Sequence, residues 1–358
     1  MLKFLAKVLA VRAALLVALR LVYLTRITGE LRQRGIWHYG TCLVSACLLV
    51  LACLAGRAWA QEYPSRPIHL IVPNSPGGAT DIAARLIAPA LSERLRQPVV
   101  IENRVSAGGV TATNAVAQTA GDGHTLLMVF DSFTTNPWLF PNVHYDPQRD
   151  FAPITLIAYA AQVFVVHPSL GPRTVEEFVR LAHERKGALA AATAGAGTSS
   201  RLSLELFRQT AAIDPTVVHY KGGSPALNDL LGGQVSAMFV NLGLALPSLR
   251  GNRLVPLGVA SLRRTPILPE VPAIAETYPG FEALTWVGLL APASTPRPIV
   301  DLLHSTLVGV LTDRAIRDKF LVQGAEVVAG GPEIFSQLIR REYDRWGKII
   351  QARHVTID

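Results

Sequence analysis

Cysteine is scarce in this chain of 358 residues, and its three cysteines, Cys42, Cys47 and Cys53, all lie near the N-terminus. Residues 61–358 contain none. That absence excludes disulfides, thiolate metal sites and cysteine nucleophiles from most of the chain.

Catalytic and cofactor-binding motifs are lacking as well. No histidine pair has the spacing of zinc ligands, and no Gly-x-Ser-x-Gly segment could present a serine nucleophile. Gly195-x-Gly197 lacks the third glycine of a dinucleotide fingerprint, and no Gly-Lys-Ser/Thr follows it. Glu176, Glu177 and Asp301 fit solvated carboxylates on helix surfaces. We therefore expect no catalytic residues, no metal and no cofactor, with an α/β enzyme acting on a small carboxylic acid as the alternative.

A net positive charge is nearly absent from most of the chain, despite a net charge of +8 for the whole sequence. Residues 1–60 hold eight Lys or Arg side chains against Glu30 alone, which leaves about +1 for residues 61–358. The basic balance therefore gives no support to nucleic-acid binding.

Residues 1–60 have the character of a leader. From residue 32 they show a basic start, the apolar run Cys42–Ala55 and a small-x-small site that ends at Ala60, as in a secretory signal peptide cleaved after that residue. Residues 1–31 hold a second apolar stretch, which two arginines make a poor membrane span. We interpret them as the product of an upstream start codon rather than as an extra membrane segment. Val44-Ser45-Ala46-Cys47 matches a lipoprotein cleavage box only loosely, so we expect no lipid anchor.

Residues 61–358 alternate short apolar runs with helix-length segments, which is typical of βα units around a mainly parallel sheet. The pattern continues past a cluster of turn residues that ends at Pro153, and no long polar linker follows. We expect an α/β fold with two lobes in contact, lobe 1 formed by residues 61–160 and 287–358 and lobe 2 by residues 161–286. Strands are expected at 68–72, 99–101, 124–130, 163–166, 189–193, 217–220, 235–240, 255–260 and 286–290, and helices at 80–96, 109–119, 175–186, 199–210, 225–231, 299–311, 315–323 and 332–352.

The segment Val72–Asp81 ends a predicted strand, turns through prolines and glycines, and begins a predicted helix. A helix start offers unpaired backbone N–H groups and the positive end of the helix dipole, and glycine lets an anion approach closely. The segment could form half of an anion site, or an ordinary connection with Thr80 or Asp81 as N-cap. Its candidate ligand-binding residues are Asn74, Ser75, Gly77, Gly78, Ala79, Thr80 and Asp81.

Two later loops repeat the arrangement. Ala194–Thr198 leads from a predicted strand into a predicted helix, and so does Tyr220–Pro225, which adds a cation. Lys221 could neutralise a bound carboxylate, or it could be a solvated charge. The candidate residues here are Gly197, Thr198, Ser199, Tyr220, Lys221 and Gly222, and Ser132 and Asn241 complete the set. Backbone amides and hydroxyls bind anions without transforming them, which favours a receptor over an enzyme.

These loops, in this order, resemble the Bug-type extracytoplasmic solute receptors, the TctC-like substrate-binding proteins of tripartite tricarboxylate transporters. The resemblance spans Tyr63 to Val355. Its motifs are Tyr63–Ile68, Pro76–Asp81, Glu102–Arg104, Asn136-Pro137, Tyr145–Pro147, Gly195–Ser200, Tyr220–Gly223, Leu230–Gln234, Gly288–Pro292 and Arg345–Gly347.

The resemblance implies a type II-like periplasmic-binding fold, in which two crossing strands join two α/β lobes that close over the ligand like a Venus flytrap. It also implies a periplasmic location and a small organic anion whose carboxylate is held by the first two loops, partly through ordered waters. The implied partner is the membrane permease of a tripartite transporter or the ectodomain of a sensor kinase, with no nucleic acid. We expect a monomer.

Several positions depart from the family's pattern. Asn74 and Ser75 stand where an aromatic residue and a second proline are common, Val240 replaces an aspartate, and Arg201 replaces a histidine. These changes bear on the identity of the ligand more than on the fold. Pro89 lies inside the first predicted helix, where a proline costs about 3 kcal/mol unless the helix bends.

Overall fold

The computed structural model describes residues 63–357 except Gly77 and Ala196. The predicted leader, with its signal peptide, its cleavage site after Ala60 and the three cysteines, lies outside the described residues. From Pro64 onward the chain forms one compact unit. None of the helices described in this unit has the length and apolar character to span a membrane.

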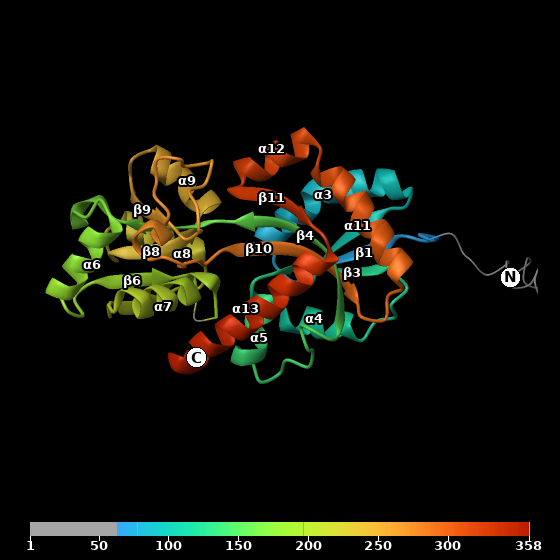
Figure 1. The fold of residues 1–358 in the computed structure, drawn as a ribbon, viewed down its shortest axis with the longest axis horizontal. Coiled ribbons are helices and arrows are strands. Elements are labelled where there is room, and N and C mark those ends of the chain that lie inside the picture. The colour runs from blue at the N-terminus through green and yellow to red at the C-terminus, as the bar shows by residue number, and fades with distance from the viewer. Residues whose placement is uncertain (1–62, 77, 196, 358) are drawn as a thin grey trace, which may run out of the picture. The chain divides into compact units, whose positions relative to one another are not determined.

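The first sheet has six strands in the order β11-β4-β10-β3-β1-β2 (Figure 1). β1 pairs in parallel with β2 and β3, whereas β10 is antiparallel to both β3 and β4, and β11 is antiparallel to β4. The bounds are β1 Ile68–Val72, β2 Val99–Asn103, β3 Thr125–Phe130, β4 Phe151–Ala160, β10 Thr285–Pro292 and β11 Ala325–Gly330.

The second sheet has five strands in the order β7-β6-β8-β5-β9. Its parallel strands β7-β6-β8 repeat the order of β2-β1-β3, and β5 is antiparallel to β8 and β9. Successive side chains of β5 belong to opposite apolar clusters, Val163 and Val165 to one and Phe164 and Val166 to the other, so both faces of this sheet are buried. The bounds are β5 Gln162–Val166, β6 Ala190–Thr193, β7 Thr216–His219, β8 Ala237–Asn241 and β9 Val255–Val259.

Two strands connect the sheets. β4 ends at Ala160 and β5 begins at Gln162, so that one residue separates a strand of the first sheet from a strand of the second. β10 returns the chain to the first sheet, and Figure 1 shows β4 and β10 side by side between the two sheets. The predicted α/β fold with two lobes and two crossing strands is therefore confirmed.

The helices cover both faces of each sheet. In the first lobe α3, α11 and α12 pack together on one face, and α4, α5 and α13 pack together on the other. In the second lobe α7, α8 and α9 pack on the strands. The bounds are α3 Ala79–Leu95, α4 Val110–Ala117, α5 Ser132–Leu139, α6 Val175–Glu184, α7 Ser199–Ala211, α8 Gly223–Leu231, α9 Leu242–Arg250, α10 Ile274–Thr277, α11 Arg297–Leu311, α12 Arg314–Val322 and α13 Pro332–Ala352.

Prolines account for several differences between the expected elements and the structure, although β11 and the short α10, which were not expected either, contain no proline. α3 continues through Pro89 without interruption, and α5 and α9, which were not expected, contain Pro137 and Pro247. The longest strand, β4, was not expected because Pro153 lies in it. The neighbouring strand β11 pairs only with the part of β4 from Leu156 onward. Pro153 has no backbone N–H to donate, and on the β11 side of β4 no strand lies opposite it to accept one.

The C-terminal helix α13 contributes to the cores of both lobes. Phe335 and Leu338 from its first half lie in a cluster with side chains of β1, β3 and β10, and Trp346 and Ile350 from its second half lie in the main cluster of lobe 2. The helix therefore links the lobes independently of the two crossing strands.

Gly288 in β10 makes room for this helix. A β-carbon at this position would lie 2.1 Å from the ring of Phe335, which is fully buried. We expect Gly288→Ala to lower the free energy of unfolding by about 1–3 kcal/mol through overpacking, measured by urea denaturation. Gly232→Ala is the matched control, because Gly232 has a right-handed backbone conformation and its β-carbon would meet nothing closer than 3.5 Å. An unchanged midpoint for Gly288→Ala would contradict the packing described here.

Candidate ligand-binding site

The carboxyl ends of the parallel strands in both sheets meet at one cleft of about 600 Å³. β1, β2 and β3 lead into α3, α4 and α5, and β6, β7 and β8 lead into α7, α8 and α9. Each of these six helices contributes its N-cap or a residue of its first turn to the lining: Thr80, Gly109, Asp131, Thr198, Gly223 and Asn241. Open α/β sheets bind ligands at this edge, outside the carboxyl ends of their strands.

Five of the six helices begin without a side-chain cap. Their N-cap residues are Gly78, Gly109, Asp131, Thr198 and Gly222. Of the described helices away from the cleft, α6 and α12 are capped by side-chain oxygens of Thr174 and Asp313 that accept backbone N–H bonds, whereas α11 and α13 also begin without a side-chain cap. The uncapped starts leave N–H groups and the positive ends of helix dipoles available at the cleft, an arrangement that suits an anion.

The first predicted loop is fixed by Asn103 at the end of β2. Its Nδ2 donates to the carbonyl of Asn74 and to Oδ1 of Asp81, at 3.0 Å in each case. Asp81 also accepts a 2.8 Å bond from Nε of Arg85, and it is buried. Asp81 is therefore a positioning residue for the loop, and it is not among the residues that line the cleft.

Three lining residues hold buried polar atoms with no hydrogen-bond partner among the described residues. These atoms are Oδ1 of Asn74, Oγ1 of Thr80 and Nε1 of Trp286. An unpaired buried polar group costs about 1–3 kcal/mol, so a ligand that pairs it recovers this free energy.

Of the other candidates in the first loop, Ser75 lines the cleft and Gly78 is the N-cap of α3. Gly77 and the side chain of Ala79 lie outside the described part of the structure.

The second predicted loop is held by its own hydroxyl groups. Oγ1 of Thr198 donates to the carbonyl of Gly195 at 2.8 Å, and Oγ of Ser200 accepts from the N–H of Ala194 at 2.7 Å. These bonds fix the turn from β6 into α7. The predicted residues Gly197, Thr198 and Ser199 all line the cleft.

The third predicted loop reaches the cleft through a different residue from those expected. Gly223 lines the cleft, whereas Tyr220, Lys221 and Gly222 do not. The hydroxyl of Tyr220 donates to Oδ2 of Asp229 at 2.7 Å, and Lys221 is exposed. Ser132 and Asn241, the remaining candidates, both line the cleft.

Asp131 and Trp286 are among the lining residues that sequence reasoning missed. Asp131 directly follows β3, so its place at the carboxyl end of a strand was the available signal. Trp286 was seen only as part of an apolar strand. Among the described residues of the lining, none is Lys, Arg or His. The described part of the chain also contains no group of three His, Asp or Glu side chains placed to hold a metal ion.

Asp131 is a buried carboxyl group in a cleft that suits anions. Burial raises its pKa to about 7, and the charge of Glu342 on α13 acts in the same direction, while a hydrogen bond with the side chain of Ser199 opposes both. Ser199 begins α7 of lobe 2, so this bond crosses the cleft from lobe 1. The cleft therefore holds a carboxyl group that binds its proton more tightly than an ordinary aspartate.

The family model described as "Tripartite tricarboxylate transporter family receptor" matches residues 83–355. Protein BugT of Bordetella pertussis is 34% identical over 311 residues, which cover 86% of this chain and 95% of that protein. Two solved structures are similar over the whole of their own length. R. palustris Rpa4515 with adipate has a TM-score of 0.73, with 33% identity over 83% of this chain. MatC (Rpa3494) from Rhodopseudomonas palustris with bound malate has a TM-score of 0.70, with 34% identity over 80% of this chain.

The raised pKa of Asp131 predicts a specific pH dependence of stability. The folded state keeps this proton between about pH 4 and pH 7, where the unfolded chain has lost it, so the stability due to Asp131 falls as pH rises through this window. We expect Asp131→Asn to remove a slope of about 1.4 kcal/mol per pH unit, measured by urea unfolding at several pH values.

Asp301→Asn is the control, because Asp301 lies in an exposed ion pair with Arg297. The free energy of unfolding of the Asp301→Asn variant should change with pH in the same way as that of the wild-type protein. Parallel curves for wild type and Asp131→Asn would show that Asp131 titrates normally.

Proposed function

Because this chain belongs to the tripartite tricarboxylate transporter family of receptors, we propose that it captures a small organic anion, by its carboxylate, in the cleft between the two lobes. Its homologues are periplasmic binding proteins. We extend their location to this chain, with residues 32–60 as the signal peptide that directs export. The partner that we propose is the membrane permease of a tripartite transporter or the ectodomain of a sensor kinase.

The observation that carries the proposal is the convergence of six helix starts on one cleft, five of them without a side-chain cap. Each helix N-terminus presents about half a positive charge, together with unpaired N–H donors. A carboxylate can be held by such groups without a Lys or Arg partner. The adipate and malate bound by two similar proteins support a carboxylate as the ligand class.

The ligand would touch both lobes. We propose the division into lobe 1, residues 61–160 and 287–358, and lobe 2, residues 161–286, because sheet membership changes at Ala161 and again near β10. A ligand that pairs with α3 of lobe 1 and with α7 of lobe 2 binds the closed arrangement better than an open one. That difference in affinity is what drives closure.

Thr80→Val tests the site with a change of one buried group. Because Oγ1 of Thr80 is buried without a partner among the described residues, its removal should leave the ligand-free protein equally or more stable. Carboxylate binding should weaken about tenfold through the loss of a donor. Calorimetric titration and thermal unfolding of the same samples measure the two effects.

Thr155→Val is the matched control. Thr155 is also fully buried, but it bonds to Nδ1 of His304 at 2.8 Å and does not line the cleft. It should lower stability and leave affinity unchanged. Unchanged affinity in Thr80→Val, or loss of stability without loss of affinity, would remove Thr80 from the site.

A further inference from the structure

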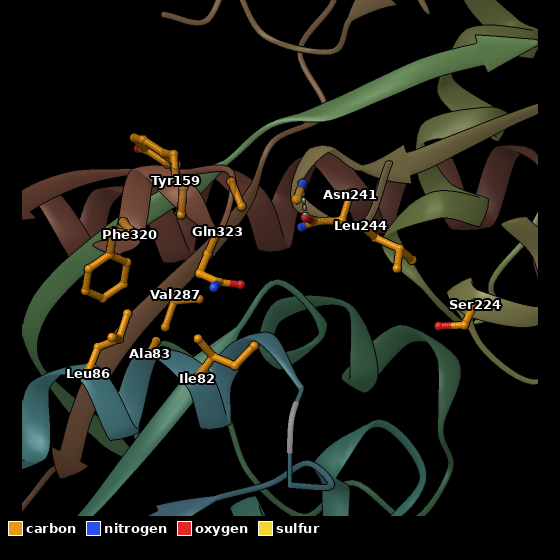
Figure 2. A pocket seen from close by; sticks show the side chains of 14 residues that line it. Ile82, Ala83, Leu86, Tyr159, Ser224, Asn241, Leu244, Val287, Phe320 and Gln323 are labelled. Carbon is orange, nitrogen blue, oxygen red and sulfur yellow. Dashed lines mark hydrogen bonds between the residues drawn. The ribbon is translucent and has the colours of Figure 1, made fainter. Parts of the chain in front are cut away.

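A second cavity of about 430 Å³ adjoins the cleft. Three residues, Ala160, Asn241 and Val287, line both spaces. Figure 2 shows Ile82, Ala83 and Leu86 of α3 on one side of the second cavity and Leu244 of α9 on the other, with Gln323 between them. A ligand held at the helix starts of the cleft can therefore extend into this space.

The second cavity has a neutral lining. Its larger side chains are mostly apolar, and its polar ones, such as Tyr159, Asn241 and Gln323, carry no charge at neutral pH. Of the described residues that line it, none is acidic or basic. A carboxylate placed here would lose hydration without gaining a cationic partner, whereas an apolar group would gain from its burial.

The positive character of the cleft comes from six helix N-termini, which act as partial charges, and Asp131 places one carboxyl group among them. A ligand carboxylate at the helix starts uses these partial charges. A second carboxylate on the ligand would lie either beside Asp131 or in the neutral second cavity, and no Lys, Arg or His is among the described lining residues of either space. Both positions are less favourable for a carboxylate than the helix starts, which favours a ligand with one carboxylate.

We infer that the ligand is a monocarboxylate whose uncharged, largely apolar body occupies the cavity formed by α3, α9, α12 and the crossing strands. This inference rests on the proposed function and narrows its ligand class. It also separates this chain from a receptor for short dicarboxylates such as malate. Leu244 and Leu86 become specificity-determining residues, because they border the space for the body of the ligand.

The test compares acids that share a carbon skeleton and differ by one carboxylate. Hexanoate against adipate, and benzoate against terephthalate, are titrated calorimetrically into the purified protein at pH 7. We expect the monocarboxylate of each pair to bind at least about tenfold more tightly. From butanoate to hexanoate the affinity should rise about fourfold per added methylene, as expected for burial of apolar area.

Leu244→Arg then places a cation in the second cavity. Leu244 is 39% exposed, so the substitution does not open the core. It should raise the affinity for adipate about tenfold and lower that for hexanoate. Leu302→Arg is the matched control, since Leu302 is 40% exposed and lines neither space. Gln323→Arg, at another exposed residue of the lining, repeats the test if Leu244→Arg does not fold.

The possible outcomes separate the two proposals. Tighter binding of adipate or terephthalate by the wild-type protein would overturn the monocarboxylate inference and leave the carboxylate receptor standing. A preference for monocarboxylates that neither arginine variant changes would show that the body of the ligand lies elsewhere, which also overturns the inference. If no acid of either series binds, the proposed function itself fails.

Discussion

The structure depends on one geometric constraint, namely that parallel strands with the same order in two sheets deliver their carboxyl ends to one place. Each strand end is followed by a helix, so six helix starts converge where the sheets face each other. Three of the five uncapped N-cap residues are glycine, which leaves the backbone accessible. The positive character of the site is therefore a property of the backbone, and a net charge of about +1 for residues 61–358 is no obstacle to anion binding.

The links between the lobes limit how the cleft can close. The first crossing has a single residue, Ala161, between β4 and β5, and α13 buries side chains in both cores. Glu205 of α7 is fully buried and accepts from Arg208 at 2.7 Å and from Arg353, just beyond α13, at 3.0 Å. Separation of α13 from α7 would remove Arg353 from Glu205 and leave this buried carboxylate with its partners Arg201 and Arg208 on the same helix. The closing motion that we propose would therefore pivot about α13, with the contacts of this helix to both lobes kept in place.

The sequence predicted the parts of the fold that follow local rules. The βα alternation, the two lobes and most helices were expected, because apolar runs and helix-length segments alternate with clear turn residues. β4 and α9 were not, because Pro153 and Pro247 obscure their patterns and long-range pairing decides them. In the site, the loops around Thr80 and Thr198 were expected from glycine-rich helix starts. Asp131 was missed because burial gives this carboxyl its importance, and one sequence alone does not reveal burial.

The most direct test of this account is a crystal structure of the protein with a bound monocarboxylate such as hexanoate. The account predicts carboxylate oxygens within hydrogen-bond distance of backbone N–H groups at the starts of α3 and α7, with the hydrocarbon chain directed toward Leu244. A carboxylate held instead by a cationic side chain such as that of Lys221, or bound outside the cleft, would contradict it.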